Sequence, residues 1–234
     1  MENRAGIGHA KVNFMKPRCS ERRNHGLTRV EVLVVIFVVG FFALMILPSG
    51  NYYSAHRKAK RIACVNNLKE ISLACRIWDG DHGNKYPMDV SVTNGGTMEL
   101  SEVGTDAWRN FLVMSNELTT PRILICPADQ RDAATNFGSS FGNTNISYFI
   151  NLDAPEANPQ MLLFGDDNFE MGRVPVEAGL LQISTNTPIA WSAARHRHAG
   201  NVAMTDGSVQ QLTTSGLQQA FQNTGAATNR IAIP

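Results

Sequence analysis

The longest apolar stretch of the chain runs from Val32 to Leu47, sixteen residues without a charge. As a helix it would extend about 24 Å, somewhat less than the roughly 30 Å hydrocarbon core of a bilayer. Glu31 precedes it directly, at a depth where an ionisable group is costly and usually functional. The pattern therefore predicts a membrane helix that begins with a functional carboxylate.

A second stretch, from Tyr52 to Trp78, has helical periodicity. Its apolar positions recur at spacings of four and three residues and share one face, formed by Cys64, Leu68, Ile71, Cys75 and Trp78. Such a face predicts packing against a sheet, and Asp79-Gly80 supplies a stop signal. Between the two helical stretches, Pro48 predicts a bend or a local melting before the helix resumes.

Beyond residue 80 the pattern changes to short apolar runs between turn residues. Strands are expected at 161–164, 180–183 and 189–191, and a short helix at about 215–222. The clearest hairpin joins 201–205 to 208–212 through Asp206-Gly207, a dipeptide that favours a type I′ turn. The predicted fold class is α+β, with one long N-terminal helix on an antiparallel sheet and loop-rich connections.

Charge divides the chain into regions. Residues 1–26 carry six Lys or Arg and two acids, whereas 27–234 carry fifteen basic and eighteen acidic residues. The positive-inside rule then leaves the leader in the cytoplasm and places the rest outside. We expect a leader at 1–26, an apolar helix at 27–50, its amphipathic continuation at 51–80 and a β-rich domain at 81–234. The basic cluster at 57–61 is interpreted as a solvated helix face or a headgroup contact, so no nucleic-acid partner is expected.

The order of basic leader, Gly26, short polar stretch, Glu31 and apolar helix resembles the amino terminus of type IV prepilins and type II secretion pseudopilins. In that family a membrane peptidase cuts after the glycine, the new terminus is N-methylated, and the glutamate at the fifth mature position serves subunit assembly. The resemblance implies that Gly26 ends the leader, that Leu27 is the methylated terminus and that Glu31 is the assembly residue. Pro48 also fits, because a proline recurs at this place in the pilin helix, whereas Arg29 is unusual.

A second resemblance lies near the carboxy terminus. His196, nine further residues and Asp206-Gly207 are similar to the H-x9-DG signature of pilin-like families of planctomycetes, verrucomicrobia and their relatives. Shorter blocks at 61–69, 86–87 and 126–129 also look like recurrent blocks of those families. Because these blocks resemble secretion-type subunits, a pseudopilus is slightly favoured over a surface pilus.

Together the resemblances imply a non-enzymatic filament subunit made in the bacterial inner membrane. It would be held there by residues 32–47, cut by the prepilin peptidase and polymerised with its own copies by an inner-membrane assembly platform. Its C-terminal domain would be periplasmic, or extracellular after assembly. No Gly-x-Ser-x-Gly, Walker, dinucleotide or His-Glu-x-x-His motif points to an enzyme instead.

Other interpretations of the amino terminus stay open. A secretory signal peptide combines a basic region, an apolar core and a small-residue cleavage site, but here Arg29 and Glu31 precede the core and no Ala-x-Ala follows it. A plain signal anchor would avoid Glu31. A different functional class is a membrane-anchored extracytoplasmic module that binds a metal or glycan through 196–206 and never polymerises.

Three cysteines follow the leader and offer at most one intrachain disulfide. Cys64 and Cys75 are eleven residues apart on one helix, about 16 Å by rise, which exceeds the roughly 7 Å limit for a bridge. A bond would therefore use Cys126, with Cys64 as the favoured partner. Three reduced and buried thiols are the equally weighted alternative.

His196 and Asp206 are candidate metal ligands, together with His198, Asp166 or Asp167. The plainer interpretation is that Asp206 shapes its turn and His196 forms a hydrogen bond within the fold. Calcium is suggested by 79–83, Asp-x-Asp-x-Gly, but the later acidic ligand of a calcium loop is lacking. A helix-terminating loop is therefore favoured there, and no cofactor is expected with certainty.

Overall fold

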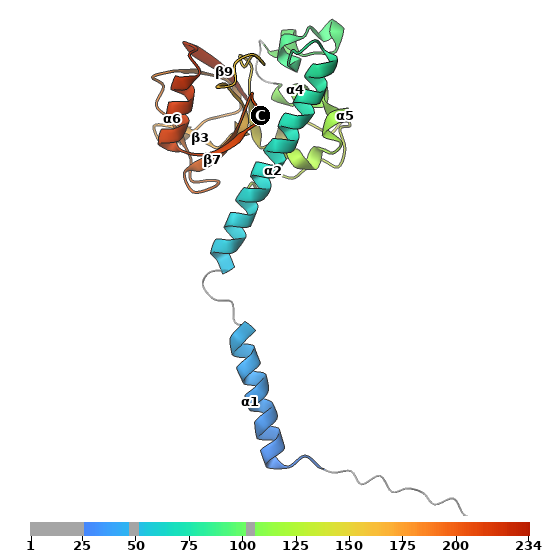
Figure 1. Cartoon of the computed structure of the whole chain (residues 1–234), viewed down its shortest axis with the longest axis vertical. Coiled ribbons are helices and arrows are strands. Elements are labelled where there is room, and N and C mark those ends of the chain that lie inside the picture. Colours follow the sequence, from blue (N-terminus) through green and yellow to red (C-terminus); the bar gives the residue numbers. More distant parts are fainter. Residues whose placement is uncertain (1–25, 47–51, 102–105) are drawn as a thin grey trace, which may run out of the picture. The chain divides into compact units, whose positions relative to one another are not determined.

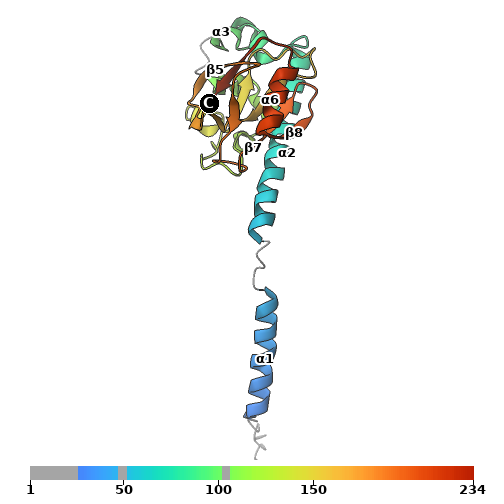
Figure 2. The same ribbon diagram turned by 90° about the vertical axis from the view of Figure 1, so that its left-hand side faces the viewer.

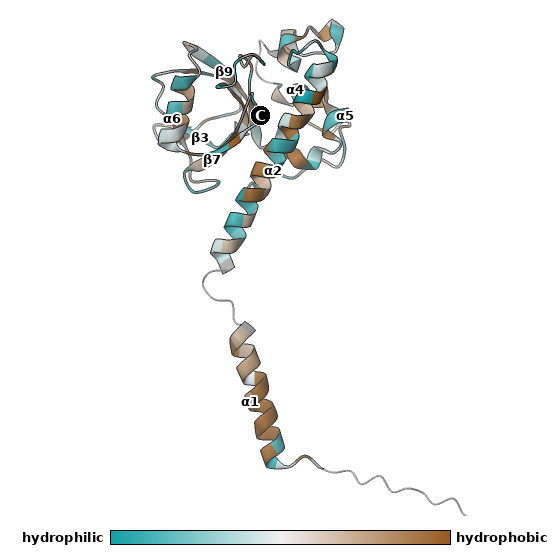
Figure 3. Ribbon diagram, viewed as in Figure 1, coloured by the Kyte–Doolittle hydropathy of each residue, from teal (hydrophilic) through white to brown (hydrophobic). Residues whose placement is uncertain are grey.

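The structure is a computed structural model that describes residues 26–46, 52–101 and 106–234. The chain divides into two compact units, Met1–Ser49 and Gly50–Pro234. In the first unit the described element is α1 (Arg29–Ile46), which Figure 3 shows as almost continuously hydrophobic. Of the helices in these ranges, none is long and apolar enough to cross a membrane. Pro48, with its predicted bend, and most of the leader fall outside the described residues.

The second unit is α+β, and its strand pairings are antiparallel. It begins with the long helix α2 (Tyr52–Asp81). Short helical segments follow: η1 (Pro87–Asp89), η2 (Val92–Asn94), α3 (Met98–Ser101), α4 (Ala107–Leu112), α5 (Ser115–Leu118), η3 (Pro121–Leu124) and η4 (Asn143–Asn145). The remaining elements are β1 (Tyr148–Asn151), β2 (Leu162–Asp166), β3 (Phe169–Met171), β4 (Val174–Pro175), β5 (Gly179–Ser184), β6 (Ile189–Trp191), β7 (Ala199–Met204), β8 (Val209–Thr213), α6 (Thr214–Asn223) and β9 (Thr228–Ile233). The α+β class with an antiparallel sheet is thus confirmed.

The main sheet has six strands in the order β5-β9-β1-β2-β7-β8, and a smaller one has the order β4-β3-β6. Alternate residues of the main sheet enter two separate cores: Ala203 lies in the core on the α2 side, whereas Val202 and Met204 lie in the other. Figure 1 shows α2, α4 and α5 on one side of the sheet and α6 with β3 of the small sheet on the other, and Figure 2 shows the α6 side facing the viewer. A buried cluster of polar residues, described below, lies where α2 meets the sheet.

The predicted packing face of α2 is confirmed. Its five apolar positions are all nearly inaccessible to solvent: Cys64, Leu68, Ile71, Cys75 and Trp78. The helix ends at Asp81, slightly beyond the expected stop, and the backbone then turns through Gly83 and Asn84 with positive φ. This segment is a helix-terminating loop, because the Asp79 carbonyl accepts hydrogen bonds from the amides of His82 and Asn84.

The Asp206-Gly207 hairpin is confirmed, but its predicted turn type is wrong. A type I′ turn needs positive φ at both central residues, whereas only Gly207 has it, at 84°. The Met204 carbonyl accepts a bond from the Gly207 amide, and the Met204 amide donates to the Ser208 carbonyl. The loop therefore has three residues with a left-handed glycine at its end, the next most common hairpin connection.

Candidate functional site

Gly26 and Leu27 lie in an exposed segment without regular secondary structure just before α1. The helix then begins with a capping box: the Thr28 hydroxyl accepts a bond from the Glu31 amide at 3.3 Å, and Glu31 Oε2 accepts one from the Thr28 amide at 2.7 Å. The Thr28 hydroxyl also donates to Glu31 Oε2 at 2.9 Å. Glu31 therefore has a local role in starting the helix, a role that Thr-x-x-Glu could have predicted.

A second set of polar residues gathers where α2 meets the sheet. Cys64 projects from α2, Cys126 follows η3, Asp166 ends β2, and His196 lies in the turn between β6 and β7. One ligand atom from each residue lies within 4.8 Å of every other, and this is the one such group of His, Cys, Asp and Glu found across the described ranges. We call these four residues the Cys-His-Asp cluster.

Short contacts hold the Cys-His-Asp cluster together. The Cys64 thiol donates a hydrogen bond to Asp166 Oδ1 at 3.2 Å, and Cys126 Sγ lies 3.2 Å from His196 Nε2. His196 Nε2 also lies 3.5 Å from Asp166 Oδ2. The four side chains are buried, with the His196 side chain only 3% exposed. This arrangement of two sulfurs, one nitrogen and one carboxylate could hold a metal ion.

Neighbouring groups orient the members of this cluster. Asn201 donates from its backbone and its side-chain amide to Asp166 Oδ2, at 2.7 and 2.9 Å. Its side-chain amide also lies 3.3 Å from Cys64 Sγ, and the Tyr148 hydroxyl donates to the same sulfur at 3.4 Å. Asp166 and Cys64 are therefore fixed by buried donors that leave them little freedom to rotate.

The backbone at His196 is strained. His196, Arg197 and His198 all have positive φ, at 51°, 56° and 55°. Left-handed backbone costs about 1–2 kcal/mol for each non-glycine residue, so three in succession persist only where the surroundings require them. The turn directs the His196 ring inward, while His198 is exposed with its Nδ1 3.1 Å from the Trp191 carbonyl.

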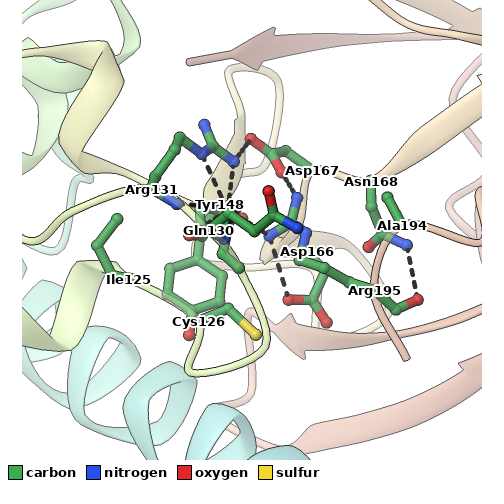
Figure 4. Close-up of polar contacts among 12 residues, drawn as sticks. Ile125, Cys126, Gln130, Arg131, Tyr148, Asp166, Asp167, Asn168, Ala194 and Arg195 are labelled. Carbon is green, nitrogen blue, oxygen red and sulfur yellow. Dashed lines mark hydrogen bonds and ion pairs between the residues drawn. The ribbon is translucent and has the colours of Figure 1, made fainter.

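A buried ion network adjoins the cluster (Figure 4). Arg195 pairs with Asp167 and lies 3.2 Å from Asp129, while Arg131 reaches the same two carboxylates at 2.6 and 2.8 Å. Arg195 also lies 4.0 Å from Asp166 Oδ1, which joins the network to the cluster. Burial alone would raise the pKa of Asp129, but Arg195, the Ser147 hydroxyl and Arg131 lower this pKa to about 2.

The two thiols of the cluster differ in acidity. The hydrogen bond to Cys126, burial and the nearby Asp166 charge raise the pKa of Cys64. The hydrogen bond from Cys64 lowers the pKa of Cys126 against the effect of burial, and His196 lowers it further. Cys126 is thus the sulfur at which a negative charge is best tolerated.

A basic pocket of about 440 Å³ opens beside His196. Its cationic lining comes from α2 and from the strained turn: Arg57, Lys58, Lys60, Arg61, Arg195 and Arg197. The basic cluster at 57–61 is therefore half of a concave surface suited to anionic groups.

Protein-family models, curated proteins and solved structures were compared with this chain, and none matched.

The cysteines and Asp206 are arranged as the plainer interpretations of the sequence expected. Cys64 and Cys126 come together as free, buried thiols and form no disulfide. Asp206 is not grouped with His196: it is exposed in the β7–β8 turn, where its side chain accepts a bond from the Ser208 amide at 2.7 Å. Asp206 shapes the turn, as the plainer interpretation expected.

Proposed function

We propose that the protein is a structural subunit of a helical filament of the type II secretion pseudopilus or type IV pilus kind, processed between Gly26 and Leu27. The observation that carries the proposal is the order Gly26, Leu27, Glu31 at the start of an apolar helix. In this proposal α2 on its antiparallel sheet is the pilin-like globular domain. The domain has no enzymatic role.

The side chains of α1 support this proposal. Apolar residues are exposed on every side of the helix, as the consecutive residues Leu33 at 66%, Val34 at 55% and Val35 at 57% show. A helix that is apolar all round is stable only when it is surrounded by lipid or by other protein. Membrane lipid around residues 32–47 before assembly, and neighbouring copies of α1 afterwards, would provide these two environments in turn.

Glu31 has a distinct part in this account. An amine and a carboxylate are each unfavourable in an apolar bundle, but together they compensate one another. Glu31 Oε2 accepts both bonds from Thr28, so we assign Oε1 to the methylated amine of Leu27 on a neighbouring copy. Such a pair would set the register between subunits.

The basic pocket is suited to the stage before assembly, when the subunit is still held in the membrane. The α2 half of its lining, 54–61, follows the apolar helix closely in sequence, and a surface rich in Lys and Arg attracts anionic headgroups. The leader would face the cytoplasm and the sheet domain the periplasm or, after assembly, the exterior. Prepilin peptidase and an inner-membrane assembly platform are the partners that this role requires.

Variants at Glu31 and Thr28 separate assembly from helix capping. Glu31→Gln retains the capping box, because Gln also serves at that position, but removes the charge. Thr28→Ala breaks the box and keeps the charge. We expect Glu31→Gln to reduce filament yield at least about tenfold, equivalent to about 1.4 kcal/mol per subunit, and Thr28→Ala to assemble nearly normally. Filaments sheared from cells and quantified by immunoblot measure both; normal assembly of Glu31→Gln would remove the proposed role.

The alternative is a membrane-anchored binding module that does not polymerise. One observation in the structure supports this alternative: the Cys-His-Asp cluster is chemically suited to a metal ion. The two proposals differ in the state of the mature chain: the module stays monomeric in the membrane, whereas the subunit is recovered in filaments.

A further inference from the structure

We propose that Cys64, Cys126, Asp166 and His196 bind one Zn²⁺ ion in a closed structural site that fastens α2 to the sheet. The site would be independent of filament assembly, since its four ligands belong to the second unit of the chain. It also differs from the His196 and Asp206 pair suggested by the sequence.

The distances between the ligand atoms carry this proposal. Zinc bonds of about 2.0–2.3 Å in a tetrahedron place neighbouring ligand atoms about 3.3–3.8 Å apart. The separations present here are 3.2 Å for Cys64 to Asp166, 3.2 Å for Cys126 to His196 and 3.5 Å for His196 to Asp166. Every pair of ligand atoms lies within 4.8 Å, so an ion can enter with small adjustments of the side chains.

The ligand types select zinc over the hard cations. Calcium and magnesium prefer a shell of oxygen atoms, whereas two thiolates and an imidazole favour zinc. Two thiolates also balance the charge of the ion, so the occupied site adds no uncompensated charge to the interior. The negative charge of Asp166 is compensated by Arg195 and by the two hydrogen bonds that Asn201 donates.

The surroundings behave as support for metal ligands. Ligating carboxylates and thiolates are normally oriented by outer hydrogen bonds, and here Asn201 holds Asp166 while Tyr148 contacts Cys64. A metal site would also explain the strained left-handed turn at His196, because this turn directs Nε2 toward the other three ligands. Four protein ligands in a buried position leave no open coordination place, which is the form of a structural site.

The test uses the full-length chain purified in detergent under reducing conditions. Metal analysis by mass spectrometry should find one zinc per chain, and competition with a chelator should give a Kd of about 1 nM or tighter. Replacement by Co²⁺ should give a thiolate-to-cobalt charge-transfer band and the spectrum of a tetrahedral ion. Absence of zinc after loading, or a cobalt spectrum without thiolate bands, would overturn the proposal.

Matched variants locate the ion. Cys126→Ser and His196→Ala should weaken zinc binding by about 100-fold or more, while Cys75→Ser and His198→Ala should bind as the unmodified chain does. Cys75 is equally buried on the same helix, and His198 shares the same turn, so each control tests position alone. Unchanged affinity in Cys126→Ser would contradict the site. A Cys64–Cys126 disulfide in freshly isolated, air-protected protein would contradict it as well, and near-UV circular dichroism verifies that each variant is folded.

Discussion

Replacing Arg195 with Met should lower the free energy of unfolding by about 3–5 kcal/mol, because it removes the most buried cation of the network and leaves Arg131 alone to face Asp129 and Asp167. Arg195 is only 6% exposed and faces Asp129, Asp166 and Asp167. Its Nη1 also donates to the Ser147 carbonyl at 3.0 Å, a bond that Met cannot replace. Denaturant unfolding of the full chain, followed by circular dichroism, gives the difference.

Arg109→Met is the matched control for this experiment. Arg109 forms an ion pair of 2.9 Å with Asp106, but both side chains are more than 40% exposed. Exposed pairs contribute about 0–1 kcal/mol, so this variant should lose little stability. If Arg109→Met and Arg195→Met lowered the free energy of unfolding equally, the buried network would contribute no more stability than an exposed ion pair.

Trp191→Ala should be the most damaging truncation in the second core, at about 3–5 kcal/mol. Trp191 is fully buried, and its ring stacks on Phe169 with centroids 5.0 Å apart. Trp108→Ala provides the comparison, since Trp108 is only partly buried and should lose less. Thermal and denaturant unfolding measure both, and a loss below that of Trp108→Ala would contradict the predicted packing.

Gly200 provides a direct test of the same contact. A Cβ at Gly200 would lie 2.5 Å from the Trp191 ring, so Gly200→Ala should cost about 1–3 kcal/mol by overpacking. Gly80→Ala, in α2 with no atom near its Cβ, should instead be neutral or stabilising by about 0.5–1 kcal/mol. In Trp191→Ala the added methyl at Gly200 has space, and the cost of Gly200→Ala should largely disappear.

The parts of the fold predicted from sequence are those set by local pattern. The 4-3 spacing from Cys64 to Trp78 identifies the buried face of α2, because helical periodicity alone determines which residues share a face. The Asp206-Gly207 turn and the α6 helix were likewise predicted from neighbouring residues. By contrast, β1 (148–151) and β9 (228–233) were not predicted, although both lie inside the main sheet. Their pairing partners are distant in sequence. The sequence therefore shows only a short apolar run at each strand, and such a run does not by itself distinguish a strand from other structure.

The Cys-His-Asp cluster could be predicted only in part. The sequence predicts that Cys126 meets Cys64, because Cys126-Pro127 is typical of a loop that could cover the helix, and this prediction identifies two members of the cluster. The sequence offers Asp166, Asp167 and Asp206 as partners for His196 without distinguishing among them, and the left-handed turn directs the ring to Asp166. No local sequence pattern predicts three consecutive left-handed residues without glycine. This backbone conformation nevertheless determines which carboxylate His196 contacts.

The most direct test of the filament proposal is the mass of the mature amino terminus. Mass spectrometry of the protein isolated from membranes and sheared filaments should identify a chain that begins at an N-methylated Leu27, with Gly26 and all preceding residues removed. An intact leader, or a terminus near Ser49 as a signal peptidase would produce, would contradict the account.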